Sequence, residues 1–129
     1  MTTGLKYDGF VPGRHLIDAY GSGGFRFGDM SHKGSVLALP SGIWALPVAE
    51  FSALTPNSLK TLFAVPKGEV ELLLIGVGVE MRLVPESLKF RLRECGIRVE
   101  AMQTGAAART YNILVAENRK VAAALIAVD

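Results

Sequence analysis

The chain has 129 residues, half of them hydrophobic and a fifth charged, so it can bury a core and is not intrinsically disordered. This length is typical of one domain, and we expect residues 1–129 to form a single domain. With 14 basic and 12 acidic residues the net charge is only +2, which on charge alone gives no support for nucleic-acid binding.

The first half of the chain predicts short strands separated by turns. Glycines and prolines interrupt it at residues 21–24 and 40–42. Between and after these turns, residues 35–39 and 43–48 have the length and the β-branched or aromatic content of strands. The segment Phe25-Arg26-Phe27 alternates apolar and polar residues, as a half-exposed strand does. The N-terminal half is therefore expected to be rich in β-structure.

The second half predicts a regular alternation of strands and helices. A first helix is expected at Thr55-Pro56, because threonine can cap a helix and proline suits its first position, and Pro66 ends it. The later elements are a strand over residues 69–77, a helix from Pro85 to Gly96, a strand over 97–102, a helix capped by Thr104, and a strand over 121–128. The fold class is therefore α/β, with a β-α-β-α-β C-terminal half.

Cysteine and histidine are scarce, and this bears on cofactors and compartment. Cys95 is the one cysteine and there are two histidines, so no internal disulfide can form and neither a metal nor another cofactor is expected. The first eight residues lack the features of a secretory signal or a mitochondrial transit peptide. The longest uncharged run, residues 34–49, contains prolines and is too short for a membrane span. These features predict a cytoplasmic protein without a membrane span.

Two glycines follow the first buried strand of the second half. In Gly76-Val77-Gly78 the glycines would let the backbone approach a ligand closely. A dinucleotide-binding fingerprint would continue to a third glycine that opens a helix, whereas here residues 79–84 intervene before Pro85. Gly76 and Gly78 therefore either contact a ligand or form a tight turn, and the turn is the favoured interpretation.

The start of the last helix is a stronger candidate for a site. Thr104 and Gly105 precede free backbone N–H groups, which are suited to binding an anion. Arg109 and Asn112 are three residues apart and so project from the same side of the helix. Arg109 could hold an anionic group, or it could form a structural ion pair with a carboxylate such as that of Glu100 or Asp29.

Two residues from the first half could form the far wall of a ligand-binding cleft at the start of the last helix. Tyr20 belongs to a glycine-rich segment, residues 20–27, that lacks the ending of a P-loop and is more simply a turn between strands. His32 could act as a general base, but no nucleophile accompanies it, and a surface or turn histidine is the simpler interpretation. No catalytic residue is assigned, and the sequence favours a protein that is not an enzyme.

Several of these segments resemble a known family in their order along the chain. The segments are residues 20–27, 32–37, 76–78, 104–112 and 121–126. Together they resemble the small, largely uncharacterised family of bacterial and archaeal single-domain proteins that includes mitochondrial respiratory complex I (NADH:ubiquinone oxidoreductase) assembly factor 3. The resemblance extends over residues 10–128, and Arg109-Thr110-Tyr111-Asn112 is its most specific part. It implies a compact domain with a mixed β-sheet and helices packed against it.

The resemblance also implies a role in assembly through protein partners. Members of the family often have a cysteine before the arginine of the last helix, whereas this chain has Ala108, so any chemistry of that cysteine is lost here. A non-enzymatic interaction or assembly factor is thus the first hypothesis, and it predicts an exposed apolar patch that includes Trp44 or Phe51.

The alternative hypothesis is a domain that binds a small molecule or an anion, with or without catalytic activity. Its site would be the cleft between Gly76-Val77-Gly78 and the helix that starts at Thr104, with Arg109 as the anion-binding side chain. Nucleic-acid binding has only scattered arginines in its favour, and none is expected. Homo-oligomerisation is left open by the sequence.

Overall fold

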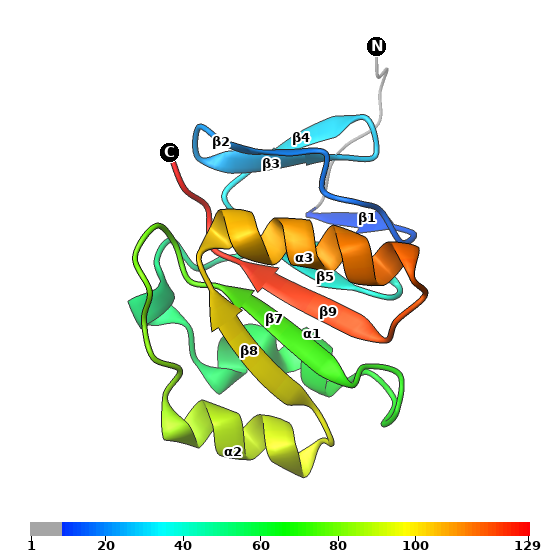
Figure 1. Ribbon diagram of the computed structural model, residues 1–129, viewed down its shortest axis with the longest axis vertical. Helices are drawn as coiled ribbons and strands as arrows, with labels where there is room; N and C mark the ends of the chain where they lie inside the picture. The colour runs from blue at the N-terminus through cyan, green and yellow to red at the C-terminus, as the bar shows by residue number, and fades with distance from the viewer. Residues whose placement is uncertain (1–8) are drawn as a thin grey trace.

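The fold is built on a six-stranded mixed β-sheet with helices on both faces (Figure 1). The computed structural model describes residues 9–129, so the expectations drawn from residues 1–8 lie outside the described part. The strands of the sheet are ordered β1-β6-β5-β9-β7-β8. Their bounds are β1 (Phe10–Pro12), β5 (Ser35–Leu39), β6 (Gly42–Leu46), β7 (Leu72–Gly76), β8 (Arg98–Met102) and β9 (Val121–Leu125). A separate three-stranded sheet contains β2 (Ala19–Gly21), β3 (Gly24–Phe27) and β4 (Met30–Lys33).

Strand β9 joins the antiparallel and the parallel parts of the large sheet. It pairs antiparallel with β5 and parallel with β7, and β7 in turn pairs parallel with β8. All five residues of β9 are buried, as is typical of a strand that is covered on both faces. The structure thus confirms the α/β class and the mixed sheet.

The two longer helices lie on opposite faces of the sheet. Leu88 and Leu92 of α2 (Glu86–Glu94) belong to one hydrophobic core, and Ala107 and Tyr111 of α3 (Thr104–Ala116) belong to the other. Strand β8 lies at the edge of the sheet beside β7, so the crossover from β7 to β8 moves toward that edge. The crossover from β8 to β9 moves in the opposite direction and passes over β7. Because the direction reverses and the helix changes face, both crossovers have the same hand, as the rule for parallel strands requires.

Smaller elements complete each face. The small sheet packs on the α3 side through Phe25 and Phe27 of β3. The α2 side carries three short elements, η1 (Phe51–Ala53), η2 (Pro56–Leu59) and α1 (Lys60–Phe63). Successive residues of β7 serve the two cores in turn, with Leu73 and Ile75 in one and Leu74 in the other.

The helix expected from Pro56 to Pro66 is divided, and this prediction is wrong in its length. The Thr55 side chain does accept a hydrogen bond from the Ser58 backbone N–H, but the chain then forms a 3₁₀ turn and only four α-helical residues. The Ser58 hydroxyl accepts a hydrogen bond from the Thr55 backbone N–H. These two reciprocal bonds form a capping box, so the predicted start of the helix is confirmed while its predicted length is not.

Two further properties concern the part of the chain that the structure describes. None of its helices has the length and hydropathy that crossing a lipid bilayer requires. No cluster of three or more histidine, cysteine, aspartate or glutamate side chains within residues 9–129 is arranged to hold a metal ion.

Candidate functional site

The ends of β7 and β8 form the point at which the chain leaves the sheet toward opposite faces. The loop after β7, residues 77–85, leads to α2, whereas Gln103 leads from β8 directly into α3. In parallel sheets a ligand usually binds at such a point, because the diverging connections leave a crevice. The structure brings Gly76, Gly78 and Thr104 together here, as the sequence predicted.

Thr104 links three parts of the chain at this point. Its backbone N–H donates to the Gly78 carbonyl at 2.9 Å, and its hydroxyl accepts from the Gly78 N–H at 3.0 Å. The same hydroxyl donates to the carbonyl of Ile126, just after β9, at 2.8 Å. Thr104 is fully buried. Its side chain therefore fastens the loop after β7 and the segment after β9 to the first residue of α3.

This use of the hydroxyl corrects the expectation that Thr104 caps the last helix. The capping residue is Gln103, whose side chain makes no capping bond, and Thr104 is already the first helical residue. The threonine side chain is turned into the sheet, where it bonds a part-buried N–H and a buried carbonyl instead. The prediction is wrong because a tertiary contact uses the group that a local cap would need.

The two glycines at this point have different reasons to be glycine. A Cβ on Gly76 would lie 2.9 Å from the Cα of Thr104, so the small residue allows the helix to approach the strand. Gly78 has a φ of +111°, a conformation that side chains disfavour, and an added Cβ would meet nothing within 4 Å. Gly76 thus permits close packing, and Gly78 permits a turn.

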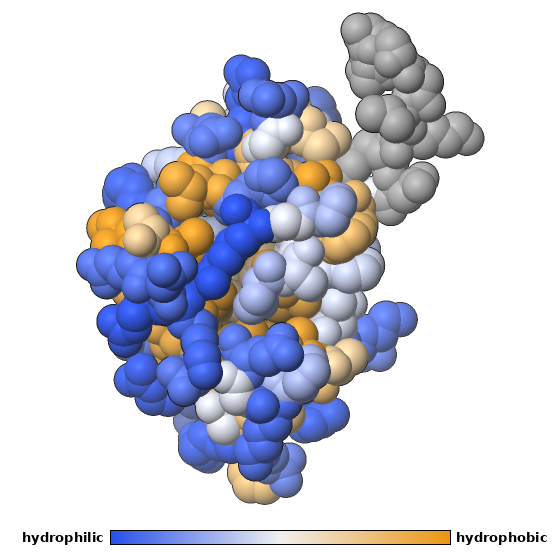
Figure 2. All heavy atoms as spheres, turned by 90° about the vertical axis from the view of Figure 1, so that its right-hand side faces the viewer, coloured by the Kyte–Doolittle hydropathy of each residue, from blue (hydrophilic) through white to orange (hydrophobic). Residues whose placement is uncertain are grey.

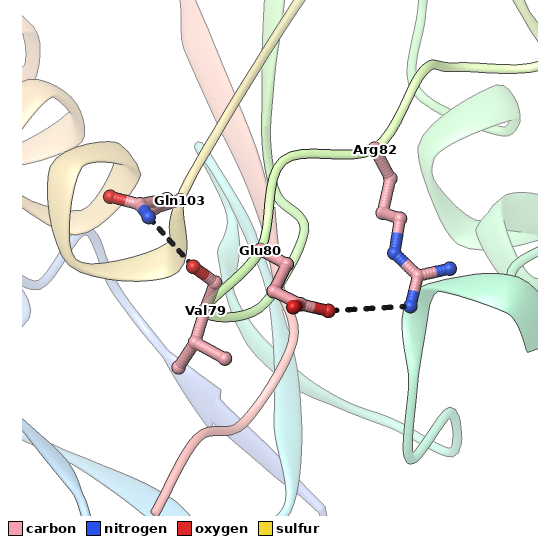
Figure 3. Close-up of polar contacts among 4 residues, drawn as sticks. All are labelled: Val79, Glu80, Arg82 and Gln103. Carbon is pink, nitrogen blue, oxygen red and sulfur yellow. Dashed lines mark hydrogen bonds and ion pairs between the residues drawn. The ribbon is translucent and has the colours of Figure 1, made fainter.

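Gln103 closes the space between the ends of β7 and β8 further. Its side-chain Nε2 donates to the Val79 carbonyl at 2.7 Å, so it reaches across to the loop after β7 (Figure 3). Together with the bonds of Thr104, this contact fills the crevice with protein groups. The structure shows how the loop is held, and the proposed binding of an anion at Thr104 and Gly105 stays a prediction.

A pocket of about 510 Å³ opens beside this point, at the ends of β7 and β9. It is lined by residues 49–52, by residues 77–80 with Arg82, and by residues 126–129. Gly78 is among the lining residues, whereas Thr104 and Arg109 are not. Of the predicted site residues, only Gly78 therefore faces this space.

Tyr20 lies against the first turns of α3. A Cβ on Gly105 would come 2.2 Å from the Tyr20 hydroxyl, so glycine at this position leaves room for the ring. The Nη1 of Arg109 donates to the same hydroxyl at 3.4 Å. Within residues 9–129 Arg109 forms no ion pair, so the carboxylate partner considered from the sequence is not found there. Tyr20, Gly105 and Arg109 meet on the outer side of α3.

A Gly105→Ala substitution tests this contact. We expect the Tyr20 ring to swing away from α3 and the bond to Arg109 to break, because the added methyl group would occupy the position of the hydroxyl. The melting temperature should change little, since the displaced atoms are the end of an exposed side chain. Two-dimensional NMR on the Tyr20 ring protons measures the displacement. An unchanged set of ring-to-helix contacts would contradict this placement.

Asn112 and His32 are held by backbone groups. The Asn112 Nδ2 donates to the Ile17 carbonyl and its Oδ1 accepts from the Ile17 N–H, both at 2.8 Å, so the amide pairs with the chain as a strand neighbour would. His32 is buried, with its Nε2 3.1 Å from the Ser35 carbonyl. Tyr20 and His32 both line a second pocket of about 330 Å³ on the small sheet.

Ser35 is a structural residue that the sequence reasoning missed. Its buried hydroxyl donates to the Val48 carbonyl at 2.6 Å and accepts from the Ala127 N–H at 2.9 Å. Ser35 therefore fastens the segment after β6 and the segment after β9 to β5, as Thr104 fastens the loop after β7 to α3. A serine in a strand gives no local signal of such a contact.

The fold and this junction define an α/β domain with a mixed sheet, in which threonine, serine and glutamine side chains fasten the connections at one end. The chain belongs to the family described as Protein of unknown function (DUF498/DUF598), whose model matches residues 17–126. An uncharacterized protein of Rhodobacter capsulatus is 38% identical over 110 residues, which cover 85% of this chain and 82% of that protein.

Two further similarities extend the comparison. The NADH dehydrogenase [ubiquinone] 1 alpha subcomplex assembly factor 3 of Xenopus tropicalis is 36% identical over 112 residues, which cover 86% of this chain and 60% of that protein. The chain thus spans well under two thirds of the length of this assembly factor. A crystal structure described as an outer membrane protein from Bartonella henselae superposes with a TM-score of 0.86 and 47% identity, over 92% of this chain and 98% of that one.

Proposed function

We infer that this protein is a non-enzymatic interaction protein that assists the assembly of a larger protein complex. The observation that carries the inference is the 36% identity to an assembly factor over 86% of this chain. Since that factor is longer, we infer the interaction role for the shared domain alone. The protein acts in the cytoplasm, through one or more protein partners.

The use of the candidate side chains supports this inference. The side chains of Thr104 and Asn112 both form hydrogen bonds with backbone groups of the same chain. Their role in the structure is to hold elements in place. The residues that remain available to another molecule on this side are Tyr20 and Arg109, both of them exposed.

Exposed apolar side chains supply the surface that a protein partner would need. The two aromatics expected there are not exposed: Phe51 is buried in the core, and Trp44 is half-buried with its ring centroid 4.1 Å from that of Phe10. This part of the prediction is wrong, because both rings pack inward. The large hydrophobic residues that are exposed are Leu16, Tyr20, Val79, Met81, Leu83, Phe90 and Ile113. In Figure 2, apolar atoms gather in patches between the hydrophilic side chains of one face.

The outer side of α3 combines three of the features that partner surfaces favour. Arg109 and Ile113 are one helical turn apart and so lie on the same side of the helix. Tyr20 contacts Arg109 and leaves part of its ring exposed. Tyrosine and arginine are enriched at protein interfaces, and an exposed isoleucine beside them adds apolar area. We assign the partner-binding surface to Tyr20, Arg109 and Ile113.

Affinity capture from an extract of the native organism tests this proposal. The wild-type protein should enrich subunits of a multi-protein complex, and Ile113→Glu should reduce that capture by about tenfold, because it places a charge in the apolar part of the surface. Ser87→Glu is the matched control, since it adds the same charge at an exposed position of α2 on the opposite face. Failure to enrich any protein, or equal capture by Ile113→Glu, would count against the proposal.

A further inference from the structure

The loop after β7 carries an unusual alternation of side chains. Residues 79–83 read Val-Glu-Met-Arg-Leu, that is, apolar, acidic, apolar, basic, apolar. The three apolar residues are among the most exposed of the large hydrophobics: Val79 by 68%, Met81 by 56% and Leu83 by 91%. A folded domain seldom exposes three large apolar side chains this close together unless a partner covers them.

The middle of this loop, unlike its ends, has unpaired backbone groups. Between Glu80 and Leu83 no backbone N–H or carbonyl forms a hydrogen bond with any described residue. The loop is nevertheless fixed at both ends, because Gln103 holds the Val79 carbonyl and Val84 is buried in the core. A fixed segment with free backbone groups and alternating side chains is a template for pairing with another strand.

The two charged side chains lie on one side of the segment. The Glu80 carboxylate and the Arg82 guanidinium point toward each other at 3.9 Å (Figure 3). The chain bends at Val79 and Glu80 and has no regular secondary structure from Met81 to Pro85, so the segment becomes strand-like only when it pairs with a partner. Both side chains are more than half exposed, and an exposed pair at this distance is weak enough to exchange partners.

We propose that two copies of this chain associate through residues 79–83, paired antiparallel about a twofold axis at Met81. In this arrangement Glu80 faces Arg82 of the partner subunit, and Val79 faces Leu83 of the partner subunit. Each charge thus meets its opposite and each apolar side chain meets another, so the segment is complementary to itself, as a twofold interface requires. The proposal goes beyond the assembly role, because it needs no other protein.

The free backbone groups select the register. If Glu80 and Arg82 of the partner subunit exchange both backbone hydrogen bonds, the pairing uses only groups that are unpaired in the single chain. Met81 then lies in the closer, non-hydrogen-bonded position on the axis, and the Val79 carbonyl keeps its bond to Gln103. Lipid would suit the apolar side chains but would leave the same N–H groups unsatisfied. A protein strand satisfies both.

A charge exchange tests the proposal. Sedimentation equilibrium over a range of concentrations should show a reversible dimer of the wild-type chain, since the contact area is small. Glu80→Arg or Arg82→Glu alone should weaken dimerisation by about tenfold or more, because each places like charges opposite one another twice across the axis. The double variant E80R/R82E should restore the dissociation constant to within about threefold of wild type. Glu117→Arg, at an exposed position at the end of α3, is the control for net charge.

Three results would overturn the proposal. One is a wild-type chain that stays monomeric at every concentration, and another is a dimer that the single charge changes leave intact. The third is a double variant as weak as either single variant. Circular dichroism on each variant shows that the fold is kept. Capture of protein partners by the surface of Tyr20, Arg109 and Ile113 is a separate measurement, so either proposal can fail alone.

Discussion

A Thr104→Val variant is expected to lose about 2–4 kcal/mol of the free energy of unfolding. Valine has nearly the shape of threonine, so the change removes the hydroxyl and little else. The Gly78 N–H and the Ile126 carbonyl would then be left without that partner inside the protein. An unpaired buried polar group costs about 1–3 kcal/mol, and the change leaves the buried Ile126 carbonyl and the part-buried Gly78 N–H without this partner. Urea denaturation followed by circular dichroism measures the loss.

Thr110→Val is the matched control on the same helix. Among residues 9–129 the Thr110 hydroxyl bonds only the sulfur of Met102, at 3.6 Å, and its loss should change the free energy of unfolding by less than about 1 kcal/mol. If the two valine variants were equally stable, the bonds of Thr104 would not contribute as described. A rise in the loop's hydrogen-exchange rate in Thr104→Val alone would show that the same bonds hold residues 77–80 in place.

Truncation of Tyr111 to alanine should cost about 3–5 kcal/mol, as large aromatic deletions in a core do. The side chain is fully buried between α3 and the sheet, among the residues of the core that also contains Phe25 and Leu74. Removing the ring would open a cavity that the surrounding strands cannot close. A thermal melt at neutral pH measures the effect, and a loss below about 1 kcal/mol would contradict the close packing described.

Tyr111→Phe gives the complementary result, because it removes the hydroxyl alone. Among the described residues this hydroxyl has no hydrogen bond of good geometry, although Arg14 lies close to it, so its loss should be nearly neutral at pH 7. Burial raises the pKa of Tyr111 above its usual value of 10.0, and the nearby positive charge of Arg14 lowers it in part. The unfolded chain therefore releases this proton first as the pH rises.

The sign of the pH effect follows from that order. Below pH 10.0 both states carry the proton and stability is independent of it; above pH 10.0 the unfolded state is favoured, so wild-type stability falls as the pH rises. The phenylalanine variant should lack this part of the alkaline loss. Parallel denaturation curves of the two proteins from about pH 9 to about pH 11 would exclude a raised pKa at Tyr111.

The elements of the second half could be predicted because each has a local signal. Buried runs marked β7 and β9, Pro85 and Gly96 bounded α2, and alternation marked β8. The strand order could not be predicted. Nothing in residues 121–125 indicates that they insert between β5 and β7, since pairing between strands far apart in sequence leaves no local pattern.

Which candidate residues lie close together could be predicted in part, again from local signals. The sequence places Gly78 and Thr104 at the ends of neighbouring elements, and the structure joins them. It does not reveal that Thr104 points inward, or that Asn112 pairs with Ile17, because those roles depend on segments 22 and 95 residues away. Side chains that serve distant backbone groups look the same in sequence as side chains that await a ligand.

The central position of β9 has a consequence for synthesis on the ribosome. Strands β1, β6 and β5 form one group and β7 with β8 another, and β9 lies between them in space although it is the last strand in chain order. A growing chain that ends before Val121 therefore exposes two open sheet edges at once. The open edges of the two groups cannot pair until residues 121–125 leave the ribosome. Nascent chains of this domain should therefore depend on chaperones up to that point.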